Sequence, residues 1–182
     1  PYSGEIVLLQ HISDADGYVD EVNSVAVASD GCIFTGSEDR RVKMWRDGVC
    51  VRTIHHDEVN GEVSVLAVLS DGARVIFTGA CSEFELYHQV QHERTFEVPV
   101  GFYVVCVAAL PDGVHFAVGI SVVAPNHSDY PDEDAIEAEG GEVRLYHIDG
   151  THVRTFKGHT KSVRAVAVTP DGQHIVSGSF DK

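Results

Sequence analysis

Four segments of the chain alternate apolar residues with others and then run into an Asp-Gly pair. The pairs are 41, 41 and 59 residues apart, at Asp30-Gly31, Asp71-Gly72, Asp112-Gly113 and Asp171-Gly172. Strict alternation over several residues predicts a half-buried β-strand. Asp-Gly supplies the positive φ angle that a tight hairpin needs. The pattern therefore predicts four successive units, each beginning with a strand and a turn.

The rest of each unit repeats as well. A short apolar strand ends near a glycine, a third strand carries an aromatic residue near its end, and a fourth strand closes the period. The glycines follow Thr35, Thr78, Val118 and Ser177, and the aromatic residues are Trp45, Tyr87 and Tyr146. Four strands in a period near 41 residues are typical of a β-propeller blade. A β-sandwich is the alternative, but it does not explain a four-part internal copy.

These residues resemble the WD-repeat (WD40) family. The strongest match is the last repeat, from Phe156-Lys157-Gly158-His159 to Asp181-Lys182, and the first repeat matches through residues 34–39 and 42–45. The resemblance implies an all-β fold, a β-propeller of four-stranded antiparallel blades. Residues 1–182 are expected to form a partial propeller, with three complete blades plus parts of two flanking blades. Residues 3–11 are expected to be the last strand of the preceding blade.

In that family a His, a Ser or Thr, an Asp and a Trp form a structural hydrogen-bonded network inside a blade. Carried over to this sequence, the network residues are His159, Ser177 and Asp181 in the fourth repeat and Thr35, Asp39 and Trp45 in the first. Tyr18 stands at the His position of the first repeat. A Ser-His-Asp set can also be a catalytic triad, but in this repeat a buried structural network is the expected role.

The third period is 18 residues longer than the first two, and the extra residues fall at 121–141. The predicted loop lies between the second and third strands and holds six acids, Asp129, Asp132, Glu133, Asp134, Glu137 and Glu139. In the family such connections surround the mouth of the central channel, where peptides commonly bind. We expect the loop to overhang that mouth and to attract a Lys/Arg-rich protein segment. A solvated loop without a binding role is the alternative.

Composition excludes several other functions. The net charge of −15 disfavours nucleic acid and anionic lipid as partners, and no apolar run is long enough for a membrane span. The four cysteines form no Cys-x-x-Cys pair, which favours reduced thiols in an intracellular, cytoplasmic protein. The cluster His55-His56-Asp57 is consecutive and is not expected to converge on a metal ion. No cofactor and no catalysis are expected.

The sequence thus predicts a non-catalytic scaffold that mediates protein–protein interactions, as one segment of a larger protein or assembly. Two alternatives stay open, a structural module of a cytoskeletal or ciliary assembly and a substrate-recruiting propeller of a multidomain enzyme. The ends of the sequence are expected to leave two open blade faces. These faces would be covered by missing propeller blades or by self-association.

Overall fold

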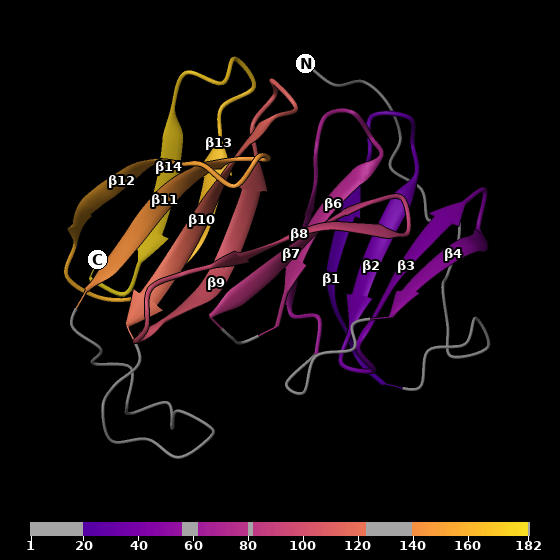
Figure 1. Cartoon of the computed structure of the whole chain (residues 1–182), viewed down its shortest axis with the longest axis horizontal. Helices are drawn as coiled ribbons and strands as arrows, with labels where there is room; N and C mark the ends of the chain where they lie inside the picture. The colour runs from indigo at the N-terminus through magenta and orange to yellow at the C-terminus, as the bar shows by residue number, and fades with distance from the viewer. Residues whose placement is uncertain (1–19, 56–61, 80–81, 123–139, 182) are drawn as a thin grey trace, which may run out of the picture.

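The computed structural model describes residues 20–55, 62–79, 82–122 and 140–181. Within these ranges the regular elements are fourteen β-strands in four antiparallel sheets (Figure 1). The first sheet contains β1 (Val22–Val27), β2 (Ile33–Ser37), β3 (Arg41–Arg46) and β4 (Val49–His55). The second contains β5 (Val65–Val68), β6 (Arg74–Thr78), β7 (Glu83–His88) and β8 (Gln91–Glu97). The third contains β9 (Phe102–Ala109), β10 (His115–Val122), β11 (Gly141–His147) and β12 (His152–His159), and the fourth contains β13 (Val163–Val168) and β14 (Ile175–Ser179).

Within each sheet, every strand pairs with the next strand in the sequence, so each sheet is a simple meander. The first strands of successive sheets contact one another, β1 with β5, β5 with β9 and β9 with β13. In Figure 1, β12 lies at the left of the view and β4 at the right. The arrangement confirms the predicted propeller blades. Three sheets are complete, and the fourth has two strands within the described residues. The segment 3–11 lies outside them.

The four predicted Asp-Gly turns join the first and second strands of each sheet. Their glycines have φ angles of +83°, +68°, +75° and +69° at Gly31, Gly72, Gly113 and Gly172. Each aspartate also caps its own turn, as when the Asp30 carboxylate accepts the Cys32 N–H at 3.0 Å. That N–H is the main cause that lowers the pKa of Asp30. The turns are thus fixed both by glycine and by a local side-chain acceptor.

Apolar side chains fill the spaces between neighbouring sheets. The largest cluster joins the second and third sheets and includes Phe84, Phe96, Phe116 and Tyr146, all at most 4% exposed. Phe84 and Phe96 stack at 4.8 Å between ring centroids, and Phe96 meets Phe116 edge-on at 5.2 Å. Because the contacts of Phe84 and Phe96 with Phe116 and Tyr146 join the two sheets, each blade depends on its neighbour for its stability.

The predicted aromatic residues take equivalent places. Trp45, Tyr87 and Tyr146 lie on β3, β7 and β11, the third strand of each complete sheet. The residues before the glycines, however, are not all equivalent, and the prediction that Thr78 corresponds to Thr35 was wrong. Trp45 pairs with Ile33, whereas Tyr87 pairs with Val75, so Phe77 occupies the position of Thr35. The turn after Asp71 is one residue longer than the turn after Asp30, and this shifts the strand by one place.

Two sheet faces expose apolar side chains. On β1, Val25 and Val27 are 65% and 66% exposed, whereas Ala26 packs toward the second sheet. On β14 of the fourth sheet Val176 is 59% exposed, and in the turn that follows β14 Phe180 is 42% exposed. No helix in the described residues is long and apolar enough to cross a membrane.

Candidate functional site

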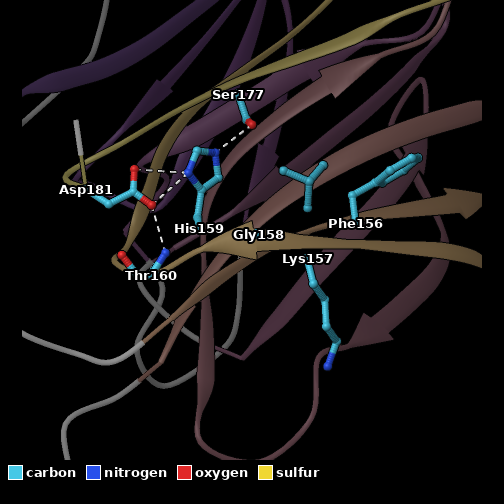
Figure 2. Close-up of a pocket in the computed structure, with 8 residues that line it drawn as sticks. Phe156, Lys157, Gly158, His159, Thr160, Ser177 and Asp181 are labelled. Atoms are coloured by element: carbon cyan, nitrogen blue, oxygen red, sulfur yellow. Dashed lines mark hydrogen bonds and ion pairs between the residues drawn. The ribbon is translucent and has the colours of Figure 1, made fainter.

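His159, Ser177 and Asp181 come together where the third sheet meets the fourth (Figure 2). His159 ends β12, Ser177 lies on β14, and Asp181 follows β14. The His159 Nε2 atom is 2.8 Å from the Ser177 Oγ atom, and Nδ1 is 3.0 and 3.1 Å from the two Asp181 oxygens. Since a carboxylate only accepts, the ring hydrogen is assigned to Nδ1, and Nε2 accepts the serine hydroxyl.

A backbone contact completes the binding of the Asp181 carboxylate. The Thr160 N–H donates to Asp181 Oδ2 at 2.7 Å. This bond, followed by the His159 ring, lowers the pKa of Asp181 despite the opposing effect of burial. Asp181 is therefore ionised at neutral pH, and it fixes both the orientation of the His159 ring and the start of the β12–β13 connection.

The local sequence holds this connection at two further points. Ser179 Oγ donates to the Lys161 carbonyl at 3.0 Å, and the Asp181 N–H donates to Ser179 Oγ at 3.3 Å. The Phe180 N–H donates to the Ser162 carbonyl at 3.2 Å. The short motif Ser-Gly-Ser-Phe-Asp thus ties the end of β14 to the segment that enters β13.

The first sheet contains the counterpart of this motif, Thr35-Gly36-Ser37-Glu38-Asp39. Ser37 Oγ donates to the Asp20 carbonyl at 3.3 Å and accepts the Asp39 N–H at 3.2 Å, which matches the contacts of Ser179. The Trp45 indole N–H donates to the Thr35 Oγ1 atom at 2.7 Å, and both residues are buried. The first sheet therefore contains the Trp–Thr part of the expected network, and the Ser–His–Asp part lies where the third sheet meets the fourth. Tyr18 lies outside the described residues.

An open pocket of about 480 Å³ lies beside the Ser–His–Asp set (Figure 2). It is lined by Val143, Phe156, Lys157, Gly158, His159, Thr160, Ser177 and Asp181. The Ser177 hydroxyl donates to His159, so its lone pairs can accept a hydrogen bond from a group in the pocket, as Thr35 accepts from Trp45. Ser177 lies inside a paired strand opposite Val166, whereas hydrolase nucleophiles commonly occupy a sharp turn.

Sequence reasoning missed the residues that surround the network. Val143 and Lys157 come from the neighbouring sheet, and Lys157 forms an ion pair with Glu142 at 2.9 Å. Arg144 contacts the same carboxylate at 2.8 Å. Only the assignment of neighbouring strands could have placed these side chains at the pocket, because no local motif marks them. The six predicted loop acids, Asp129, Asp132, Glu133, Asp134, Glu137 and Glu139, lie outside the described residues.

Comparison with known proteins agrees with this geometry. The family model described as "WD domain, G-beta repeat" matches residues 9–46 and 150–182. The chain contains WD40 repeats. The two matched segments are the repeats with hydroxyl residues at the Thr35 and Ser177 positions. In the two repeats between them, which the family model does not match, Phe77 and Val118 occupy that position.

Curated relatives match most of this chain at low identity. The serine-threonine kinase receptor-associated proteins of Mus musculus and Gallus gallus are each 22% identical, over 92% and 91% of this chain. The nuclear distribution protein nudF of Aspergillus niger is 24% identical over 85% of this chain. The matched part of this chain covers only 36% to 43% of the length of these relatives.

Proposed function

We propose that this chain is a non-catalytic WD40 scaffold that binds other proteins, as one segment of a larger protein or assembly. The blade architecture supports the proposal, because it is held together by contacts between sheets and leaves its loops and faces for partners. The names of the relatives point the same way, since one is a receptor-associated protein and the other a nuclear distribution protein. The observation that carries the proposal is the pair of matched WD40 repeats within these sheets.

A structural role for His159, Ser177 and Asp181 follows from their correspondence with the first sheet. Ser177 aligns with Thr35, which is buried beneath Trp45 and has no access to a substrate. A third strand beside β14 would cover Ser177 in the same way. The set thus acts as a clasp between the β12–β13 connection and β14, and not as a nucleophile with its base.

The partner that we propose is a Lys/Arg-rich protein segment, attracted by the acidic segment 121–141. The segment leaves the sheet beside the clasp, because the Gly140 N–H donates to the Thr160 carbonyl at 2.9 Å. The backbone at Gly141 is also close to the β12–β13 connection, since a Cβ atom at Gly141 would lie 2.7 Å from the Lys161 carbonyl oxygen. Clustered acids without local bases accelerate the encounter with a basic partner more than they tighten the complex.

The test is the association rate of a Lys/Arg-rich peptide, measured by stopped-flow fluorescence at low and high salt. One variant converts Asp132, Glu133, Asp134 and Glu137 to Asn or Gln. A matched control changes the net charge equally by neutralising four exposed acids of the first and second sheets, Asp20, Glu21, Asp47 and Glu97. The segment variant should bind more slowly at low salt, and the control should bind at a rate closer to that of the unmodified chain.

Added salt should remove the difference, because the screening length falls from about 10 Å at 0.1 M to about 3 Å at 1 M. Equal association rates for the two variants at low salt would contradict a steering role for residues 121–141. Circular dichroism of each variant checks that folding is unchanged.

The exposed faces of the first and fourth sheets support a second kind of partner. Val25, Val27, Val176 and Phe180 are the apolar side chains that a neighbouring blade would cover, whether from further chain or from a second copy. We expect the 182-residue chain to self-associate in light scattering. A monodisperse monomer with a sharp unfolding transition would contradict this expectation.

A further inference from the structure

Basic side chains pair with the carboxylates at the turns of the three complete sheets. In the third sheet these bases differ from those in the first two. In the first sheet Arg46 pairs with Asp30. In the second, Arg74 pairs with Asp71 at 2.7 Å and with Glu93 at 2.8 Å. The strand registers place His147 where Arg46 stands and His115 where Arg74 stands. Two imidazoles thus replace the permanently charged guanidinium groups.

Each imidazole is held by its own aspartate. His115 Nδ1 is 2.7 Å from Asp112 Oδ2, and His147 Nδ1 is 2.9 Å from Asp149 Oδ1. Backbone N–H groups fix both carboxylates, since Asp112 accepts from residues 114 and 115 and Asp149 accepts from Thr151 at 2.8 Å. The Asp149 N–H donates to His147 Nδ1 at 3.2 Å, so a hydrogen on this Nδ1 requires that the closer Asp149 Oδ1 atom, at 2.9 Å, become its partner in place of the N–H. A metal ion bound at Nε2 would select this form, because it places the ring hydrogen of each histidine on Nδ1, toward a carboxylate.

The two rings are also placed side by side. His115 and His147 are direct cross-strand partners on β10 and β11, and their ring centroids are 4.9 Å apart at an interplanar angle of 65°. Each side chain is about a third exposed. Neither Nε2 atom makes a hydrogen bond within the part of the chain that the structure describes. Both Nε2 atoms are therefore available to a ligand from solvent.

This is the chemistry of a metal-binding histidine pair. A carboxylate that holds Nδ1–H orients the ring and makes Nε2 a better ligand. Two Zn–N bonds of about 2.0–2.1 Å at a tetrahedral angle bring the ring centres to about 5 Å from each other. The observed separation of 4.9 Å agrees with that value. A divalent ion would also neutralise the two aspartates, as the arginines do in the first two sheets.

We propose that His115 and His147 bind a divalent transition-metal ion, such as Zn²⁺, through their Nε2 atoms. Imidazole nitrogen suits Zn²⁺, Ni²⁺ and Cu²⁺ better than Mg²⁺ or Ca²⁺. No group of three potential ligands with metal-binding geometry occurs among the described residues, so water completes the coordination. Asp112 and Asp149 act as positioning residues. Sequence reasoning missed the pair because 31 residues separate the two histidines.

Titration of the full chain with Zn²⁺ tests the proposal, with calorimetry for the number of ions and NMR for the histidine ring signals. The NMR readout is needed because the chain has eleven histidines. Two variants remove the pair, His147→Arg, which introduces the residue of the first sheet, and His115→Gln. The matched control is His88→Gln, which changes the single histidine at the same position of the second sheet, opposite Arg74.

In the unmodified chain, Zn²⁺ should shift the ring signals of His115 and His147 together. Both pair variants should bind one ion fewer, and His88→Gln should bind the same number. Asp112→Asn should weaken the affinity by about 10- to 100-fold. Ring signals that stay unshifted at millimolar Zn²⁺ would overturn the proposal, as would pair variants that bind as many ions as the control. Circular dichroism confirms that each variant is folded.

Discussion

Replacing Thr35 with valine isolates the hydrogen bond that joins β2 to β3 in the first sheet. Valine keeps the shape of the side chain but removes the hydroxyl to which the Trp45 indole donates at 2.7 Å. Thr35 is 5% exposed and Trp45 is 1% exposed, so water cannot replace the lost acceptor. A buried donor left without a partner costs about 1–3 kcal/mol. We expect Thr35→Val to lower the free energy of unfolding by that amount.

The same change should appear in thermal unfolding. For a chain of about 150–250 residues, 1 kcal/mol corresponds to about 2–4 °C in Tm. The expected decrease for Thr35→Val is therefore about 2–12 °C. The control variant Thr35→Ser keeps a hydroxyl and should retain the hydrogen bond. It should lose only the smaller contribution of one buried methyl group.

A double-mutant cycle separates this bond from the other contacts of Thr35. Trp45→Phe removes the donor, and the double variant with Thr35→Val removes both ends of this hydrogen bond. Its loss of stability, measured by urea unfolding with circular dichroism, should be smaller than the sum of the single losses by about 0.5–3 kcal/mol. Strictly additive losses would refute the reasoning, as would a Thr35→Val variant within about 0.5 kcal/mol of the unmodified chain.

Three further predictions concern packing, acid stability and thiol reactivity. A Cβ atom at Gly36 would lie 2.4 Å from the Val63 side chain, whereas one at Gly178 would meet nothing closer than 3.9 Å. Urea unfolding should thus show a loss of about 1–3 kcal/mol for Gly36→Ala and a smaller loss for Gly178→Ala, and equal losses would contradict the packing argument. The Thr151 hydroxyl and N–H, followed by the His147 ring, lower the pKa of Asp149 from 3.8 to about 2. This depressed pKa adds stability above pH 3.8 that is lost as the pH falls toward 2. The urea midpoint of Asp149→Asn should therefore fall less steeply between pH 3.8 and 2 than that of the unmodified chain. Equal slopes for the two proteins would contradict this prediction. Burial raises the pKa of Cys106 to about 11, so iodoacetamide at mildly alkaline pH should alkylate it more slowly in the folded chain than in urea, and equal rates would contradict its burial.

The repeating elements could be predicted from the sequence because each depends on local chemistry. Asp-Gly turns, alternating strands and third-strand aromatics are determined within a few residues, and Trp45, Tyr87 and Tyr146 lie where the period places them. The position of Thr78 could not be predicted in the same way. One extra residue in the turn after Asp71 moves Phe77 into the Thr35 position, and only the pairing with β7 reveals this shift.

Contacts between distant residues were predictable only where a family motif specified them. The motif named His159, Ser177 and Asp181, although the first and the last lie 22 positions apart. No motif links His115 with His147, and their approach follows from the register of β10 and β11. The same holds for Val143, which lines the same pocket as Ser177 only because the third and fourth sheets are neighbours.

The central claim is that His159, Ser177 and Asp181 hold WD40 strands together and do not catalyse. The most direct test exposes the folded chain to a fluorophosphonate, which reacts with activated serines, and compares its urea unfolding with that of Ser177→Ala. The account predicts no adduct at Ser177 and a stability loss of about 1 kcal/mol in the variant. An adduct at Ser177 that requires the folded chain, with unchanged stability of Ser177→Ala, would contradict the account.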